Sequence, residues 1–260
     1  QLIAGFALLL GAESQGEVEI AGAIVPPILG SLTIVALYFL ARELFGRRVG
    51  LLSALFLAIN PQHASTSIFA RPDHHVFETF LLVNLVLFLV IAEKRPKKWL
   101  WSAAVAGFFA AALGYSWIGA AAYLGAFLIY VVVQTAIDLR RGLSSEDELS
   151  IFLVAFGVAV ALMLPFWREA WLLPSFFAAA GVLIFVLFLL ASSRQFRERD
   201  LSWKAFPPAV ALLGYLLLIS ACALGPSVGV CHLFDEGLSY FFGGGLSWKV
   251  AEAAPLRGAV

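Results

Sequence analysis

The sequence predicts an all-α, polytopic membrane protein: a bundle of about eight transmembrane helices followed by an external loop. Hydrophobic residues make up 62% of the 260 residues and charged residues only 13%, whereas an ordinary globular domain is about 25% charged. The basic residues are dispersed over short segments instead of gathering on one face, so the zero net charge gives no indication of nucleic-acid binding. The lipid bilayer is therefore the expected partner, and nucleic acid is not.

Eight apolar runs approach or exceed the length of about 20 residues that a helix needs to cross a bilayer core. Residues 1–19 contain a shorter run and are expected to form an external or interfacial segment before the helix bundle of 20–224. The glycine-rich remainder, 225–260, is expected to be an external loop, truncated from a longer protein. The eight predicted spans are 20–41, 49–69, 76–92, 99–114, 117–137, 150–166, 171–192 and 206–224.

The first two spans carry unusual residues. Pro26 and Pro27 predict a kink near one end of the first span, which is tolerated where neighbouring helices satisfy the freed carbonyls. The second run is apolar only over 49–59 and crosses only if the polar residues 60–67 are included. Such groups cannot face lipid unpaired. We expect them to line protein or a watery cavity beneath the motif described next.

Residues 71–78 read Arg-Pro-Asp-His-His-Val-Phe-Glu and concentrate ionisable groups at the rim of a predicted span, where such groups indicate a functional site. Pro72 favours extended backbone before it, and alternate residues of an extended chain point the same way. Asp73 and His75 are therefore predicted to face one divalent ion, with His74 pointing elsewhere. A carboxylate and an imidazole favour Mn²⁺ over Mg²⁺.

A structural role for Asp73 stands beside the metal role. Aspartate is a preferred N-cap residue, and a helix beginning at His74 would place Asp73 at that position. The two roles can coexist because they need not use the same carboxylate oxygen. Spacing alone leaves both open.

The basic residues predict the orientation of the spans. Thirteen of the seventeen Lys and Arg residues fall on one side, which the positive-inside rule makes cytoplasmic. Asp73 and residues 225–260 would then face the exterior. The thirteen are Arg42, Arg47, Arg48, Lys94, Arg95, Lys97, Lys98, Arg140, Arg141, Arg194, Arg197, Arg199 and Lys204.

Residues 60–63 (Asn-Pro-Gln-His) and 71–78 together resemble the second acidic motif of the oligosaccharyltransferase catalytic subunit, in its archaeal AglB form. Glu252 resembles the glutamate of the Thr-Ile-x-Glu motif in the family's long external loop, although Lys249 stands where the family usually has Thr. If the eight spans are the family's second to ninth, both motifs fall where the family has them. The resemblance implies the membrane domain of a GT-C type glycosyltransferase.

The resemblance also implies the chemistry: transfer of an oligosaccharide from a dolichol phosphate or pyrophosphate carrier to Asn in Asn-x-Ser/Thr. It places the enzyme in the cell membrane with its active site on the external face. Asp73 and Glu252 would be catalytic, Asp73 and His75 would bind Mn²⁺ or Mg²⁺, and Glu252 would hydrogen-bond the acceptor amide. His74 and Arg71 are candidates for contact with the lipid phosphate.

The family's first acidic loop and its soluble C-terminal domain are missing from these 260 residues, so this part alone is expected to be inactive. Two other functions stay open at this point. Another polyprenyl-phosphate-sugar-dependent membrane glycosyltransferase would share the acidic motif but lack the segment around Glu252. A multispan transporter would use residues 60–67 as part of its pathway, and it predicts ionisable groups deep inside several spans.

Overall fold

The computed structural model describes residues 2–9, 11–70, 74–116, 120–166 and 180–189, and the regular elements within them are helical, as the predicted all-α class requires. The chain divides into two compact units, Gln1–Lys204 and Ala205–Val260, and every described residue lies in the first. The helices are α1 (Leu2–Leu9), α2 (Gln15–Phe45), α3 (Arg47–Ala58), α4 (Pro61–Thr66), α5 (His74–Lys94), η1 (Pro96–Lys98), α6 (Trp99–Ser116), α7 (Ala120–Arg141), α8 (Glu146–Met163), η2 (Leu164–Phe166) and the apolar helix Ala180–Leu189.

Four helical stretches in this part of the chain are long and apolar enough to cross a membrane, so the protein is a multi-pass membrane protein. Helix α8 overlaps most of the expected run 150–166. It begins four residues earlier, with three acidic residues in its first turn. The run 206–224 lies outside the described residues, as does most of 171–192. The four stretches are Gln15–Phe45, His74–Lys94, Pro96–Ser116 and Tyr123–Arg141.

The predicted second span, 49–69, is not one continuous helix, and that expectation was wrong. Helix α3 ends at Ala58, and a separate helix α4 begins at Pro61. The backbone of Asn60 is extended, with ψ 121°, and its side-chain oxygen accepts a hydrogen bond from the His63 amide at 3.0 Å. The residue before a proline is driven out of the helical region, so Asn60 ends one helix and caps the next.

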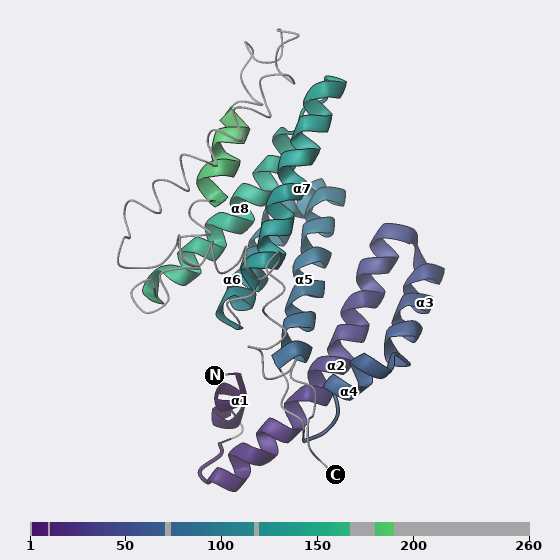
Figure 1. Ribbon diagram of the computed structural model, residues 1–260, viewed down its shortest axis with the longest axis vertical. Helices are drawn as coiled ribbons and strands as arrows, with labels where there is room; N and C mark the ends of the chain where they lie inside the picture. The colour runs from purple at the N-terminus through teal and green to yellow at the C-terminus, as the bar shows by residue number, and fades with distance from the viewer. Residues whose placement is uncertain (1, 10, 71–73, 117–119, 167–179, 190–260) are drawn as a thin grey trace, which may run out of the picture. The chain divides into compact units, whose positions relative to one another are not determined.

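Helix α5 packs between α2 and α6, and α6 packs in turn against α8 (Figure 1). Small residues make the second contact close. Ala103, Ala106 and Ala110 of α6 are buried, and a Cβ added to Gly107 would lie 2.4 Å from the carbonyl oxygen of Ala155 in α8. Interfaces of this kind let two helix backbones approach closely in membranes, where dispersion contacts replace hydrophobic burial.

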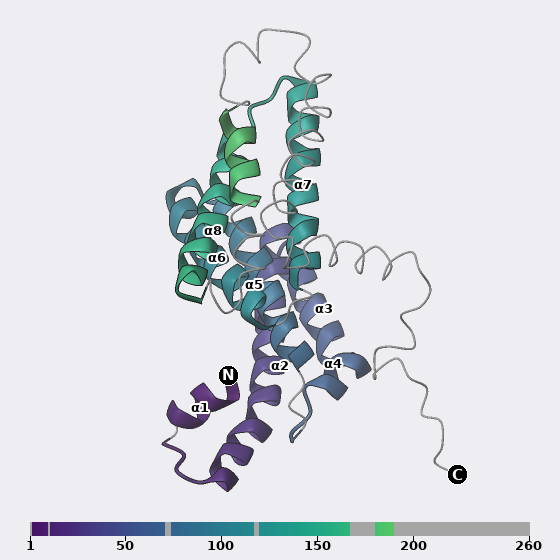
Figure 2. The same ribbon diagram turned by 60° about the vertical axis from the view of Figure 1, so that its left-hand side comes forward.

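Both ends of α2 are held. At the N-terminal end Ser14 and Glu17 form a capping box, which satisfies amide groups that the first turn leaves unpaired, and α1 lies beside this end (Figure 2). At the C-terminal end Lys94 Nζ donates a hydrogen bond to the Glu43 carbonyl at 2.6 Å, and Arg95 forms an ion pair with the Glu43 carboxylate. The C-terminal ends of α2 and α5 are therefore joined directly.

Candidate functional site

Three ionisable side chains meet in the first turns of α5. His74 Nε2 lies 3.7 Å from Glu78 Oε1, and His75 Nδ1 lies 3.4 Å from Glu78 Oε2. The histidine ring centroids are 4.1 Å apart. Both histidines are exposed, whereas Glu78 is buried with 5% relative exposure. Because residues three and four apart share a face of a helix, the spacing of these residues brings one carboxylate beneath both rings.

The packing of α5 on α2 holds this turn in place. Val76 is 2% exposed and packs with Val25 and Leu29 of α2. The partly buried rings of Phe77 and Phe80 pack against the same cluster. One side of the turn is thus fixed by apolar contact with α2, while the histidines stay accessible.

The segment that leads to the motif is anchored to the same stretch of α2. Pro27 has no backbone N–H, so the carbonyl of Ala23 receives no hydrogen bond from position 27. The N–H of Ala70 donates to that carbonyl at 3.1 Å. Ala70 adopts φ 62°, a left-handed conformation that costs roughly 1–2 kcal/mol for a residue with a Cβ. The partner of this freed carbonyl is thus a turn residue, not a residue of a neighbouring helix.

Helix α4 packs about two turns further along α2, at Gly30. His63 is buried, and its Nε2 lies 3.2 Å from the Gly30 carbonyl oxygen; since a carbonyl only accepts, Nε2 carries the proton and donates. A Cβ added to Gly30 would lie 2.4 Å from Ser67 Cβ, so only glycine allows this approach. His63 and Ser67 therefore face protein, one of the two positions expected of the polar residues 60–67, whereas Asn60 and Gln62 are exposed.

Of the predicted site residues, the structure describes His74 and His75. Arg71, Asp73 and Glu252 lie outside the described residues, and their roles stay predictions. The helix does begin at His74, the start that an Asp73 cap would require. His74 is not turned away from His75, contrary to the extended-chain expectation, because both residues already belong to the first helical turn.

Glu78 is the last residue of the motif 71–78, but the sequence predicted no role for it. The signal that would have found it is its spacing of four and three residues from the two histidines, which matters only once the helix is known to begin at His74. In an extended conformation of the motif, Glu78 would not lie next to both histidines.

The donor set suits a divalent metal ion. One ligand atom each from His74, His75 and Glu78 lie within 4.8 Å of one another. Bonds of about 2.0–2.3 Å to one ion place two ligands at most about 4.6 Å apart, so small side-chain rotations bring them into range. Glu78 Oε1 is buried and has no hydrogen-bond partner within the described part of the chain. A buried carboxylate oxygen is costly without a partner, and a cation would satisfy it.

Fold and cluster together define a polytopic helical membrane protein with a candidate metal site at the end of a span. The family model described as oligosaccharyl transferase STT3, N-terminal, matches residues 14–197. The chain belongs to this oligosaccharyl transferase family.

Two archaeal glycotransferases are similar over most of the chain. The dolichyl-monophosphooligosaccharide–protein glycotransferase AglB of Haloferax volcanii is 25% identical over 293 residues, which cover 100% of this chain and 27% of that protein. The dolichyl-phosphooligosaccharide–protein glycotransferase 2 of Archaeoglobus fulgidus is 24% identical, over 86% of this chain and 33% of that protein. The chain thus spans about a third or less of the length of these relatives.

Solved structures support the fold. The oligosaccharyltransferase AglB of Archaeoglobus fulgidus in complex with an inhibitory peptide and a dolichol-phosphate has a TM-score of 0.74 and 20% identity, covering 92% of this chain and 30% of that one. A crystal structure of an oligosaccharyltransferase of the same organism with Zn and sulfate has a TM-score of 0.72 and 21% identity, covering 87% of this chain and 31% of that one. At these identities the likeness establishes the membrane-domain architecture alone.

Proposed function

We propose that the complete protein is an oligosaccharyltransferase that moves an oligosaccharide from a dolichol-linked phosphate or pyrophosphate to Asn in Asn-x-Ser/Thr. The observation that carries the proposal is the cluster of His74, His75 and Glu78, directly after Asp73, in a chain of this family. The names of the relatives support the donor class, since both are glycotransferases named for a dolichyl-linked oligosaccharide and a protein acceptor.

In this proposal Asp73 and His75 hold Mn²⁺ or Mg²⁺ on the external face of the membrane. When bound, a divalent ion acts as a Lewis acid on the leaving phosphate. Of the three clustered side chains that could hold an ion, we assign only His75 as a ligand. Glu78 supports it through the 3.4 Å contact between His75 Nδ1 and Glu78 Oε2, which fixes the ring's orientation and tautomer. We assign contact with the donor phosphate to His74, in the same turn, and to Arg71.

The acceptor requires a separate carboxylate. An amide nitrogen is a poor nucleophile, so a hydrogen bond that orients the acceptor carboxamide lowers the barrier by positioning it. We assign this role to Glu252. Because a first acidic loop and an acceptor-binding domain are expected outside these 260 residues, we propose that this part alone is inactive.

The test is glycopeptide formation from a dolichol-linked donor and an Asn-x-Thr peptide. Asp73→Ala and His75→Ala in the complete protein are expected to abolish product, and His74→Ala to reduce it less. Glu252→Gln should lower transfer sharply while donor binding persists. Robust product from Glu252→Gln, or from residues 1–260 alone, contradicts the roles assigned here to Glu252 and to the missing parts.

A further inference from the structure

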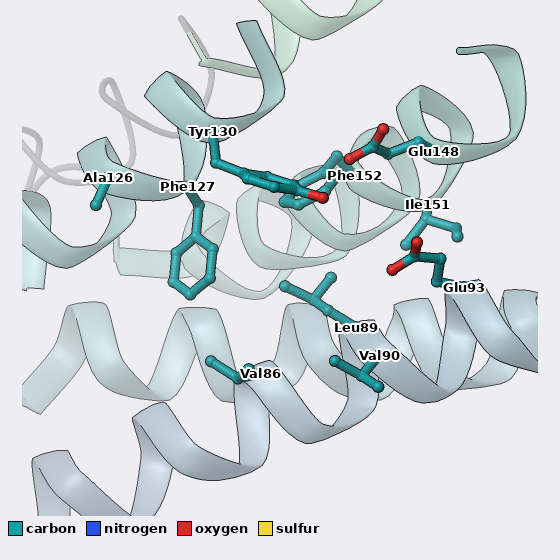
Figure 3. A pocket seen from close by; sticks show the side chains of 10 residues that line it. All are labelled: Val86, Leu89, Val90, Glu93, Ala126, Phe127, Tyr130, Glu148, Ile151 and Phe152. Carbon is teal, nitrogen blue, oxygen red and sulfur yellow. The ribbon is translucent and has the colours of Figure 1, made fainter. Parts of the chain in front are cut away.

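A second candidate site lies far along α5 from the histidine cluster. A cavity of about 350 Å³ opens between α5, α7 and α8, with walls that include Val86, Leu89, Phe127 and Phe152 (Figure 3). Its volume falls within the range of roughly 300–1,000 Å³ typical of small-molecule sites. At 1.5 Å per helical residue, the fifteen residues from Glu78 to Glu93 correspond to about 22 Å. This cavity is therefore separate from the proposed catalytic site.

The polar groups of the cavity gather on one side. The carboxylates of Glu93 on α5 and Glu148 on α8 lie there together with the hydroxyl of Tyr130 on α7 (Figure 3). Glu148 Oε1 is buried and has no hydrogen-bond partner among the described residues. Burial raises the pKa of Glu148, and the negative charges of Asp138 and Glu93 raise it further, whereas a hydrogen bond with Tyr130 lowers it. The charged groups that shift the pKa of Glu148 are thus acidic, and no cation of the described residues is among them.

The polar and apolar parts of the cavity are arranged along the span as the head and tail of a lipid-like molecule are arranged in a bilayer leaflet. Glu93 immediately precedes Lys94, the last residue of the candidate span His74–Lys94, so the polar side lies at the end of the span. Val86 and Leu89 precede Glu93 by seven and four residues, so the apolar walls extend towards the middle of α5. A molecule with an apolar tail and a polar head would lie here as it lies in a bilayer leaflet.

We propose that this cavity binds one amphiphile, whose hydrocarbon chain fills the apolar part and whose protonated amine head donates hydrogen bonds to Glu148 and Glu93. An ammonium group offers three donors and one positive charge. It therefore satisfies the buried Glu148 oxygen and offsets the repulsion between the two carboxylates. A hydroxyl head satisfies one oxygen without the charge, and an anionic head adds repulsion.

The test compares three probes with the same twelve-carbon chain: dodecylamine, dodecanol and dodecyl phosphate. Each is titrated at pH 7.5 into the full-length protein in lipid nanodiscs, and native mass spectrometry measures the bound fraction. Hydrogen bonds to charged groups are the stronger ones, so dodecylamine is expected to bind one per chain about tenfold more tightly than dodecanol. Dodecyl phosphate is expected to bind most weakly.

Three variants assign the preference to the cavity. Glu148→Gln should lower dodecylamine binding about tenfold, to the level of dodecanol. Asp147→Asn removes the same charge from the neighbouring, exposed position of α8 and should leave the preference intact. Ala126→Phe narrows the cavity and should weaken dodecylamine and dodecanol alike. Equal binding of amine and alcohol, tighter binding of the phosphate, or equal effects of Asp147→Asn and Glu148→Gln would overturn the proposal.

Discussion

The amide of Ala70 donates a hydrogen bond to the carbonyl of Ala23 at 3.1 Å, and that carbonyl is available because Pro27 has no N–H to offer it. The contact ties the segment before the acidic motif to α2. Val76, just after the motif's histidines, packs on Val25 and Leu29 of the same helix. A proline inside α2 thus helps to place the candidate metal site.

The first prediction concerns this anchor. Pro27→Ala supplies an N–H and removes the ring clash, so the Ala23 carbonyl should return to its place in the helix and release Ala70. Loss of a hydrogen bond worth about 1 kcal/mol predicts roughly fivefold faster amide exchange at Ala70, measured by hydrogen–deuterium exchange. Pro26→Ala is the matched control, because its new N–H points to the Gly22 carbonyl. Equal exchange in the two variants contradicts the anchor.

The second prediction concerns Glu78 as the carboxylate that supports the histidines. Glu78→Gln keeps the shape but removes the charge, and the loss of such a partner typically costs about 10–100-fold in metal affinity. Mn²⁺ binding to the complete protein, measured by isothermal titration, should weaken by that factor. Glu19→Gln changes an exposed carboxylate of α2 and should have no effect. An unchanged Mn²⁺ affinity in Glu78→Gln excludes the assigned role.

The third prediction concerns the contact between α6 and α8. Gly107→Ala places a Cβ 2.4 Å from the Ala155 carbonyl oxygen, so backbone must move, at a cost of about 1–3 kcal/mol. The Tm in detergent should fall. Gly157→Ala, on α8, places its Cβ where nothing lies within 4 Å; since alanine favours a helix over glycine, its Tm should stay equal or rise. A similar Tm in both variants argues against the close contact.

The fourth prediction concerns pH. The folded-state pKa of Glu148 is raised above its ordinary value of 4.5, first by burial and then by Asp138 and Glu93. A carboxyl with a raised pKa destabilises the fold once pH exceeds the unfolded value, because folding then favours the protonated form. Glu148→Gln should therefore raise the Tm at pH 8 and leave it unchanged well below pH 4.5. The exposed Asp147→Asn should shift the Tm little at either pH. A Tm gain that is independent of pH would rule out this cause.

Local patterns in the sequence predicted much of the fold. The expected span 76–92 lies inside α5, and 99–114 lies inside α6, because long apolar runs leave a helix few alternatives in a membrane. The prediction of one span over 49–69 was wrong because Asn60, the residue before Pro61, is driven out of the helical region, so one helix ends and another begins there. The sequence carried that signal.

Other features of the site depend on contacts that no local pattern contains. Ala23 and Ala70 are 47 residues apart in the sequence. The left-handed conformation of Ala70 is not predictable from its residue type, because glycine and asparagine are the residues that usually adopt it. The grouping of His74 and His75 with Glu78 follows from helical spacing, but only after the first residue of α5 is known. Packing and register, which arise from the whole chain, decided these points.

The hydrogen bond from Lys94 to Glu43 and the ion pair of Arg95 with Glu43 have a mechanical consequence. They join α2 to α5 at the ends opposite the Ala23–Ala70 hydrogen bond, and the two helices pack along the length between. Because α2 is held by contacts near both ends of this pair, neither helix can rotate about one contact without straining the contact at the other end. We therefore expect α2 and α5 to move together and not independently.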